Sequence, residues 1–110
     1  MTNKYNARKV EIDGHTFDSQ KEATRYCELK LLQDAGIISD LELQPVFELQ
    51  PKFKRGKITY RAIKYIADFR YKDENGNVIV EDSKGYKTAI FRIKEKMLLY
   101  KYPDIDFRIT

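Results

Sequence analysis

Hydrophobic and polar positions divide the chain into two helical stretches and several strand-like ones. Residues 19–35 predict a helix that begins with Ser19 and Glu22, a capping-box pattern, and ends before Gly36, a residue typical of helix C-termini. Its apolar residues spread around much of the helical wheel, so we expect it to be covered on more than one side. Residues 88–102 predict a second helix, which ends before a proline.

Between and after these helices the pattern favours strands. The predicted strands cover residues 41–49, 58–71, 78–84 and 106–109. The first contains Pro45, which argues for an edge or a bulge. The second is apolar on both faces, as expected for a central strand covered on both sides. Asn75-Gly76 predicts a two-residue hairpin turn into the third strand, and residues 10–14 predict a shorter extended piece or hairpin.

The order of elements is helix, three strands, helix, strand, or α-β-β-β-α-β. Hairpins make the first three strands antiparallel, while the second helix is a crossover that lets the last strand pair in parallel. We therefore expect an α/β fold with a small mixed sheet flanked by helices. Residues 10–110 would form one domain, and residues 1–9 a flexible basic tail.

The amino-acid composition limits the classes of protein to which the chain can belong. The chain has 110 residues, with 21 Lys and Arg against 17 Asp and Glu and a net charge of +4, which is compatible with a nucleic-acid partner. Its single cysteine, Cys27, excludes an internal disulfide and a cysteine-based zinc site. No apolar run is long enough to span a membrane, and the N-terminus has no apolar signal region, so we expect a cytoplasmic protein.

The candidate chemistry lies in Asp68, Asp82 and Lys84. Side chains alternate along a strand, so Asp82 and Lys84 share a face, and a neighbouring strand can bring Asp68 beside them. Two carboxylates and an ammonium group suit a hard divalent cation next to a phosphodiester. Taken singly, each residue is compatible with a structural ion pair or a strand-end cap. Glu81 is one residue out of step and should face the other side.

Glu22 has two interpretations. It can be the acidic partner of the Ser19 cap, stabilised by the helix dipole, or a third carboxylate aimed at the metal. It shares a helix face with Tyr26 and Leu29, which turns it towards the core. His15, the only histidine, lies in a predicted turn, where we expect a surface role.

Two groups of basic residues could hold a phosphate backbone. The first group lies in a predicted turn and comprises Lys52, Lys54, Arg55 and Lys57. The second group lies around the second helix and comprises Lys87, Arg92, Lys94, Lys96 and Lys101. A solvated charged face accounts for each group by itself. Lys87 is the exception, because it follows the candidate metal site closely.

The ordered set of motifs resembles the PD-(D/E)XK nuclease superfamily over residues 10–110. The chain is also similar to a family of small phage and prophage proteins with this nuclease signature, and more distantly to transposon end-cleaving endonucleases and Holliday-junction resolvases. The motifs are Asp13-Gly14, Phe17-Asp18-Ser19 with Glu22, Gly36-Ile37-Ile38, Leu41-Glu42, Gln44-Pro45, Tyr65-Ile66-Ala67-Asp68-Phe69, and Glu81-Asp82-Ser83-Lys84-Gly85 with Thr88. The superfamily motif has proline before its first aspartate, where this chain has Ala67.

The resemblance implies a restriction-endonuclease-like core and an Mg²⁺- or Mn²⁺-dependent DNA endonuclease that serves phage DNA replication, recombination or processing in the host cytoplasm. Asp68, Asp82 and the Ser83 carbonyl would bind the metal, with Glu22 acting directly or through a water molecule. Lys84 would orient the attacking water. Resolution of a four-way junction would require a homodimer. The alternatives are a DNA-binding or assembly protein without activity on the same fold, and a structural protein.

Overall fold

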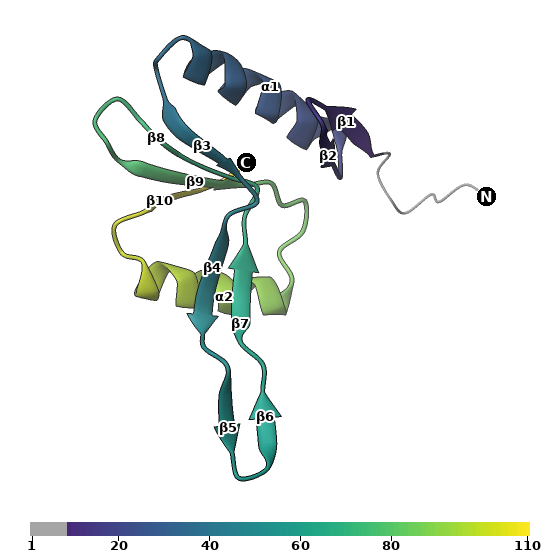
Figure 1. Cartoon of the computed structure of the whole chain (residues 1–110), viewed down its shortest axis with the longest axis vertical. Coiled ribbons are helices and arrows are strands. Elements are labelled where there is room, and N and C mark those ends of the chain that lie inside the picture. The colour runs from purple at the N-terminus through teal and green to yellow at the C-terminus, as the bar shows by residue number, and fades with distance from the viewer. Residues whose placement is uncertain (1–8) are drawn as a thin grey trace, which may run out of the picture.

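A four-stranded mixed sheet organises the molecule, and the computed structural model describes residues 9–110. The strands lie in the order β10 (Asp106–Ile109), β9 (Val78–Asp82), β8 (Phe69–Lys72) and β3 (Ser39–Leu43). β10 pairs with β9 in parallel, and the other pairs are antiparallel. The expected directions of pairing are therefore confirmed, and the fold is mixed α/β (Figure 1).

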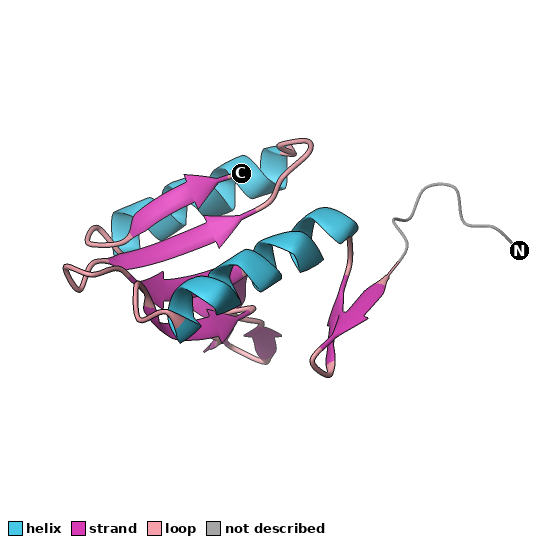
Figure 2. Ribbon diagram, turned by 90° about the horizontal axis from the view of Figure 1, so that it is seen from above, coloured by secondary structure: helices cyan, strands magenta, loops and turns pink. Residues whose placement is uncertain are grey.

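The two helices, α1 (Gln20–Asp34) and α2 (Ala89–Lys101), begin and end within one residue of the predicted positions. The Ser19 hydroxyl accepts the Glu22 N–H at 3.1 Å and caps α1, while the Thr88 hydroxyl caps α2 in the same way. Figure 2 shows the helices on opposite sides of the sheet. Neither helix in residues 9–110 is long and apolar enough to cross a membrane.

Each face of the sheet has its own hydrophobic core. Ile79 and Val80 are neighbours in β9, yet Ile79 belongs to the α1 side and Val80 to the α2 side, as strand alternation requires. The α1 core includes Ala23, Tyr26, Leu29, Phe69 and Tyr71, and the α2 core includes Phe47, Tyr65, Phe91 and Leu98. The sheet is therefore covered on both sides.

The strand predicted over residues 58–71 is interrupted. It consists of β6 (Ile58–Tyr60), β7 (Ile63–Ile66) and β8, and its upstream partner is likewise divided into β3, β4 (Val46–Gln50) and β5 (Phe53–Arg55). β4 pairs with β7, and β5 pairs with β6, in two separate ladders. The predicted basic turn is thus a hairpin that projects away from the sheet (Figure 1). We call residues 51–62 the arm.

Of two other predicted connections, one is confirmed and the other is wrong. β1 (Val10–Ile12) and β2 (His15–Phe17) form the expected hairpin, with Asp13 and Gly14 in left-handed conformations. The connection from β8 to β9 spans residues 73–77 rather than two residues.

The longer connection from β8 to β9 is stabilised by its first residue. The Asp73 carboxylate accepts backbone N–H groups of Asn75 and Asn77, each at 2.9 Å, and holds this larger loop closed. The predicted tail, residues 1–9, lies outside the described residues except for Lys9, which is exposed.

Candidate active site

Two neighbouring strands are interrupted at the same level, and we call this level the strand break. One interruption is Gln44–Pro45, between β3 and β4, and the other is Ala67–Asp68, between β7 and β8. Gln44 N–H donates to the Asp68 carbonyl at 2.9 Å, and Ala67 N–H donates to the Pro45 carbonyl at 3.2 Å. Gln44 is left-handed with a φ of 51°, and Pro45 has no N–H, so the regular ladder cannot continue. Asp68 therefore sits at a bend of the paired strands.

Asp68 is held against the end of β9. Its backbone N–H donates to the Glu81 carbonyl at 3.1 Å, and its Oδ2 accepts the Ser83 N–H at 2.7 Å. Burial raises the pKa of Asp68 to about 7; the Ser83 N–H acts in the opposite direction, and the charges of Asp82 and Glu22 raise the pKa further. Asp68 is thus a carboxyl group placed where its negative charge is costly.

Asp82, the last residue of β9, is almost completely buried, with 2% of its surface exposed. The Tyr65 hydroxyl donates a hydrogen bond to its Oδ2, and Lys84 Nζ lies 3.3 Å from the same oxygen. Lys84 Nζ also lies 5.2 Å from the centre of the Phe91 ring. Burial raises the pKa of Tyr65, and its bond to Asp82 adds to the shift, so the phenol stays a proton donor. Lys84 and Asp82 therefore share a face, as predicted.

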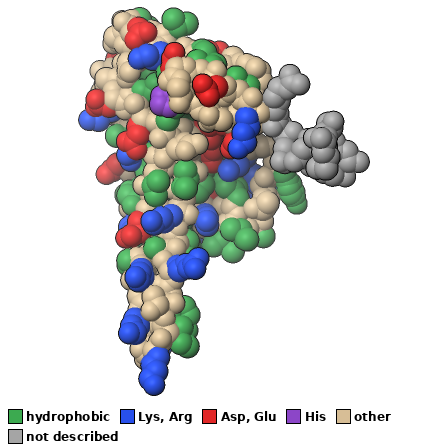
Figure 3. All heavy atoms as spheres, turned by 45° about the vertical axis from the view of Figure 1, so that its right-hand side comes forward, with side chains coloured by type: hydrophobic (Ala, Val, Ile, Leu, Met, Phe, Trp, Pro, Cys, Tyr) green, Lys and Arg blue, Asp and Glu red, His purple; other side chains and the backbone are tan. Residues whose placement is uncertain are grey.

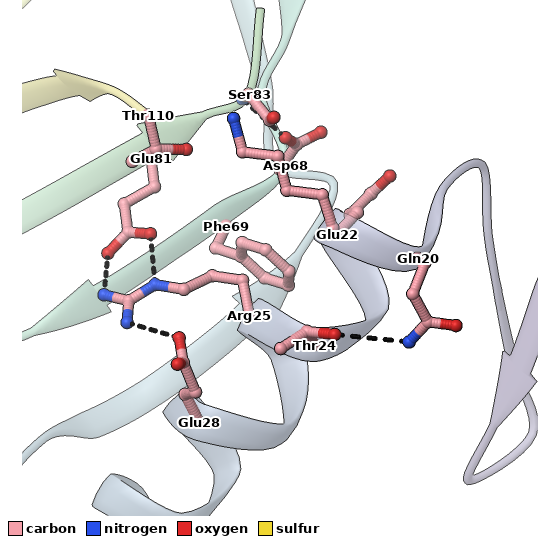
Figure 4. Close-up of a pocket in the computed structure, with 11 residues that line it drawn as sticks. Gln20, Glu22, Thr24, Arg25, Glu28, Asp68, Phe69, Glu81, Ser83 and Thr110 are labelled. Carbon is pink, nitrogen blue, oxygen red and sulfur yellow. Dashed lines mark hydrogen bonds and ion pairs between the residues drawn. The ribbon is translucent and has the colours of Figure 1, made fainter. Parts of the chain in front are cut away.

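Glu22 lies in the first turn of α1 and is 8% exposed. Its backbone N–H takes part in the Ser19 cap, which leaves its carboxylate free to lie beside Asp68 (Figure 4). Burial raises the pKa of Glu22, and the charges of Asp18 and Asp82 contribute in the same direction. The two interpretations of Glu22 are compatible, because the cap uses its backbone and the site uses its side chain.

Glu81 faces the opposite side from Asp82 and ties α1 to the sheet. Arg25 donates two hydrogen bonds to the Glu81 carboxylate, from Nε and an Nη, each at 2.7 Å (Figure 4). The Tyr71 hydroxyl donates another hydrogen bond to the same carboxylate. Burial alone would raise the pKa of Glu81, but the Arg25 and Tyr71 hydrogen bonds outweigh it and lower the pKa. Arg25 lies one turn after Glu22, so this fork fixes the part of α1 that carries the Glu22 carboxylate.

Two hollows meet at Glu22 and Asp68. One, of about 300 Å³, is also lined by Arg25, Glu81 and Ser83. The other, of about 330 Å³, lies on the β1–β2 side, where its lining includes His15 and Gln44. The pair of carboxylates is therefore reachable from two directions. His15 is exposed, as expected, and it also borders the site.

The carboxylates suit a hard divalent cation in their donor chemistry. Residues 9–110 contain no group of three or more His, Cys, Asp or Glu side chains already arranged to hold a metal ion. Glu22, Asp68 and Asp82 nonetheless supply oxygen atoms, which Mg²⁺ and Mn²⁺ prefer. The raised pKa values of Glu22 and Asp68 report crowded, poorly solvated negative charge, which a cation would neutralise. The chemistry of these three side chains thus fits the divalent cation that the sequence predicts.

Comparison with known proteins places the chain in a family. A family model described as "Protein of unknown function (DUF1064)" matches residues 2–110. The chain belongs to the DUF1064 family. A search of curated proteins found no match, and a search of solved structures found none either. The family description assigns no activity, so the function of this DUF1064 member must be argued from the site.

The structure brings together the predicted residues Glu22, Asp68, Asp82 and Lys84. The predicted basic residues lie elsewhere: Lys52, Lys54, Arg55 and Lys57 on the arm, Lys87 half-buried between β9 and α2, and Arg92 exposed on α2. Sequence reasoning missed Tyr65 and the Arg25–Glu81 fork. Arg25 carried one signal in the sequence, since it lies three residues after Glu22 and so on the same side of a helix.

Proposed function

We propose that the protein is an Mg²⁺- or Mn²⁺-dependent DNA endonuclease of the PD-(D/E)XK type, which hydrolyses phosphodiester bonds. One observation carries the proposal: the buried carboxylates of Glu22 and Asp82 lie close to the half-buried Asp68 and Lys84, and these four come from α1, the strand break and the end of β9. Burying like charges together is costly, and such an arrangement is typical of a functional site rather than of a stabilising one.

Each residue has a role in this proposal. Asp68, Asp82 and the Ser83 carbonyl would hold the cation, with Glu22 as a further oxygen donor. The ion, when bound, would supply charge neutralisation at the phosphate and a more acidic water. Tyr65 keeps the Asp82 carboxylate oriented through its hydrogen bond. Lys84 is held 3.3 Å from Asp82, from where its ammonium would orient the attacking water and stabilise charge developing on the phosphate.

The arrangement of elements supports a restriction-endonuclease-like core. The mixed sheet has a helix on each face, and its last strand, β10, runs parallel to β9. The site lies at the start of β8, next to the strand break, and at the end of β9. A fold alone does not establish chemistry, so the proposal depends on the site residues.

Cleavage of labelled duplex, flap and four-way-junction DNA with Mg²⁺, Mn²⁺ or EDTA tests the proposal. Asp82→Asn, which keeps the shape of the side chain, should abolish cleavage and leave DNA binding largely intact. Asp34→Asn, at the exposed end of α1, is the matched control and should cut normally. Equal cutting by Asp82→Asn and the parent protein, prepared side by side, would contradict the assignment. DNA binding without cutting under any metal would favour the non-enzymatic alternative.

A further inference from the structure

The arm carries exposed aromatic rings. Phe53 and Tyr60 stack across the β5–β6 hairpin, with ring centres 4.9 Å apart and planes 10° from parallel. They remain 39% and 44% exposed, and neighbouring Ile58 is 58% exposed. None of these three side chains contributes to the cores formed by the described residues. The pair therefore stabilises little of the fold and is available for contact with a partner.

The arm is also strongly basic. Its cations are Lys52, Lys54, Arg55, Lys57 and Arg61, all exposed, and no Asp or Glu occurs between Glu48 and Asp68. Figure 3 shows Lys and Arg side chains along the projecting end of the molecule, with hydrophobic side chains on one edge. A polyanion is the partner that this charge complements.

Three of the four residues on one face of the hairpin are aromatic or aliphatic, and the fourth, Arg55, is a cation. Phe53 pairs with Tyr60, and Arg55 with Ile58, so these four share one face, while Lys54 and Thr59 share the other. On this face Phe53 and Ile58 have no side-chain hydrogen-bond donor with which to read base edges in a duplex groove, and Arg55 stands beside the rings where its charge suits a phosphate. The aromatic rings do match the flat face of a base, and DNA exposes the flat faces of its bases only where the strands are unpaired.

We propose that the arm binds unpaired nucleotides, with bases stacking on Phe53 and Tyr60 and phosphates held by the basic residues. This inference rests on the proposed nuclease function and specifies its substrate class: DNA in which a single-stranded segment adjoins a duplex. Tyr60 lies eight residues before Asp68, a separation of at most about 26 Å in extended chain. The arm can therefore hold an unpaired strand whose junction with the duplex lies within this distance of the site.

Binding in EDTA isolates the arm from cleavage. Fluorescence anisotropy would compare a blunt duplex with the same duplex carrying an oligothymidine overhang. The parent protein should prefer the overhang. Phe53→Leu combined with Tyr60→Leu should lose about tenfold in affinity for the overhang DNA and remain unchanged on the blunt duplex. Tyr100→Leu removes an aromatic ring that is 89% exposed on α2, and should change neither affinity.

The charged residues give a second, separable readout. Lys54→Ala combined with Lys57→Ala should weaken binding to both DNAs and reduce the salt dependence by about two counterions. Lys30→Ala with Lys72→Ala removes the same charge from residues that pair with Asp34 and Asp40, and should have a smaller effect.

Two results would overturn the arm proposal: an aromatic variant that binds both DNAs like the parent, or one that loses affinity for both equally. Thermal unfolding of each variant checks that the domain is intact. Failure of the nuclease proposal looks different, because it would leave overhang preference in place without metal-dependent cutting. Cutting by a protein with no overhang preference would refute the arm proposal alone.

Discussion

The candidate active site and the arm both concentrate charge, but they do so under opposite physical conditions. At the site, Asp82 is 2% exposed, Asp68 has a pKa raised to about 7, and hydrogen bonds or an ion pair hold Asp68, Asp82 and Lys84 in place. On the arm, every basic side chain is exposed to solvent. Buried charge is costly and indicates chemistry, whereas exposed charge costs little and indicates attraction of a partner. Charge density alone does not distinguish the two.

Replacing a lysine in each region should give the largest contrast. Lys84→Met should lower the cleavage rate by about 10²- to 10³-fold, because it removes a donor positioned at the developing charge. Lys57→Met on the arm should lower it by less than about tenfold and should recover at low salt, since it removes only long-range attraction. Single-turnover cleavage at two salt concentrations measures both. Similar losses for the two variants would remove the distinction between the regions.

Two ion pairs of different burial should differ in their effect on stability. Arg25→Met leaves the buried Glu81 carboxylate without two donors and should lower the free energy of unfolding by about 2–4 kcal/mol. Arg70→Met breaks a pair with Glu42 at an exposed surface and should cost less than about 1 kcal/mol. Urea denaturation compares them. If the two losses agree, Arg25 is not anchoring α1 to the sheet.

The cost of the Asp68 charge predicts a stabilising substitution. Its pKa is raised from 3.8 to about 7 in the folded protein, so the folded state binds more protons than the unfolded state between those values. Stability of the metal-free protein should therefore fall as pH rises through this window and level off above it. Asp68→Asn avoids this loss and should be more stable at pH about 8, by about 1–2 kcal/mol after allowance for solvent screening.

Denaturation in EDTA at acidic and at alkaline pH measures this difference. Asp104→Asn, at an exposed position before β10, is the control and should match the parent at both pH values. Added Mg²⁺ should stabilise the parent more than Asp68→Asn at alkaline pH. An Asp68→Asn protein that is less stable than the parent throughout would show that Asp68 serves the fold rather than the site.

The smallest expected effect is that of the aromatic arm substitutions on the stability of the fold. Phe53→Leu with Tyr60→Leu should change the free energy of unfolding by less than about 1 kcal/mol, because a cross-strand pair outside the cores contributes little. Phe69→Leu, in the α1 core, should cost about 1–3 kcal/mol. Thermal unfolding resolves the two. A large loss from the arm variant would mean that the arm supports the domain.

Local signals explain why both helices could be predicted from the sequence. Ser19, Thr88 and the residues that end each helix act within a few positions, so they can be read from a short window. The pairing of Asp82 with Lys84 followed from strand alternation, which is also local. Pro45 predicted an irregular strand, because the effect of a proline on its strand is also local.

The remaining features depend on contacts between distant residues. The interruption before Asp68 lies opposite the one at Gln44–Pro45 in the partner strand, so its position depends on which strands pair. Arg25 and Glu81 are 56 positions apart, and Tyr65 meets Asp82 only when β7 and β9 have been brought together. Pairings of this kind are products of the tertiary fold, which a single sequence does not reveal.

The parallel pairing of β10 with β9 has a consequence for how the site is made on the ribosome. Asp82 belongs to β9, but Arg108 and Ile109 lie beside Glu81 and Asp82, and the Thr110 N–H donates to the Asp82 carbonyl at 2.9 Å. These neighbours are synthesised only after the whole of α2. A nascent chain therefore carries all four site side chains before it carries the strand that fixes Asp82, so the candidate site is completed only after β10 has been made.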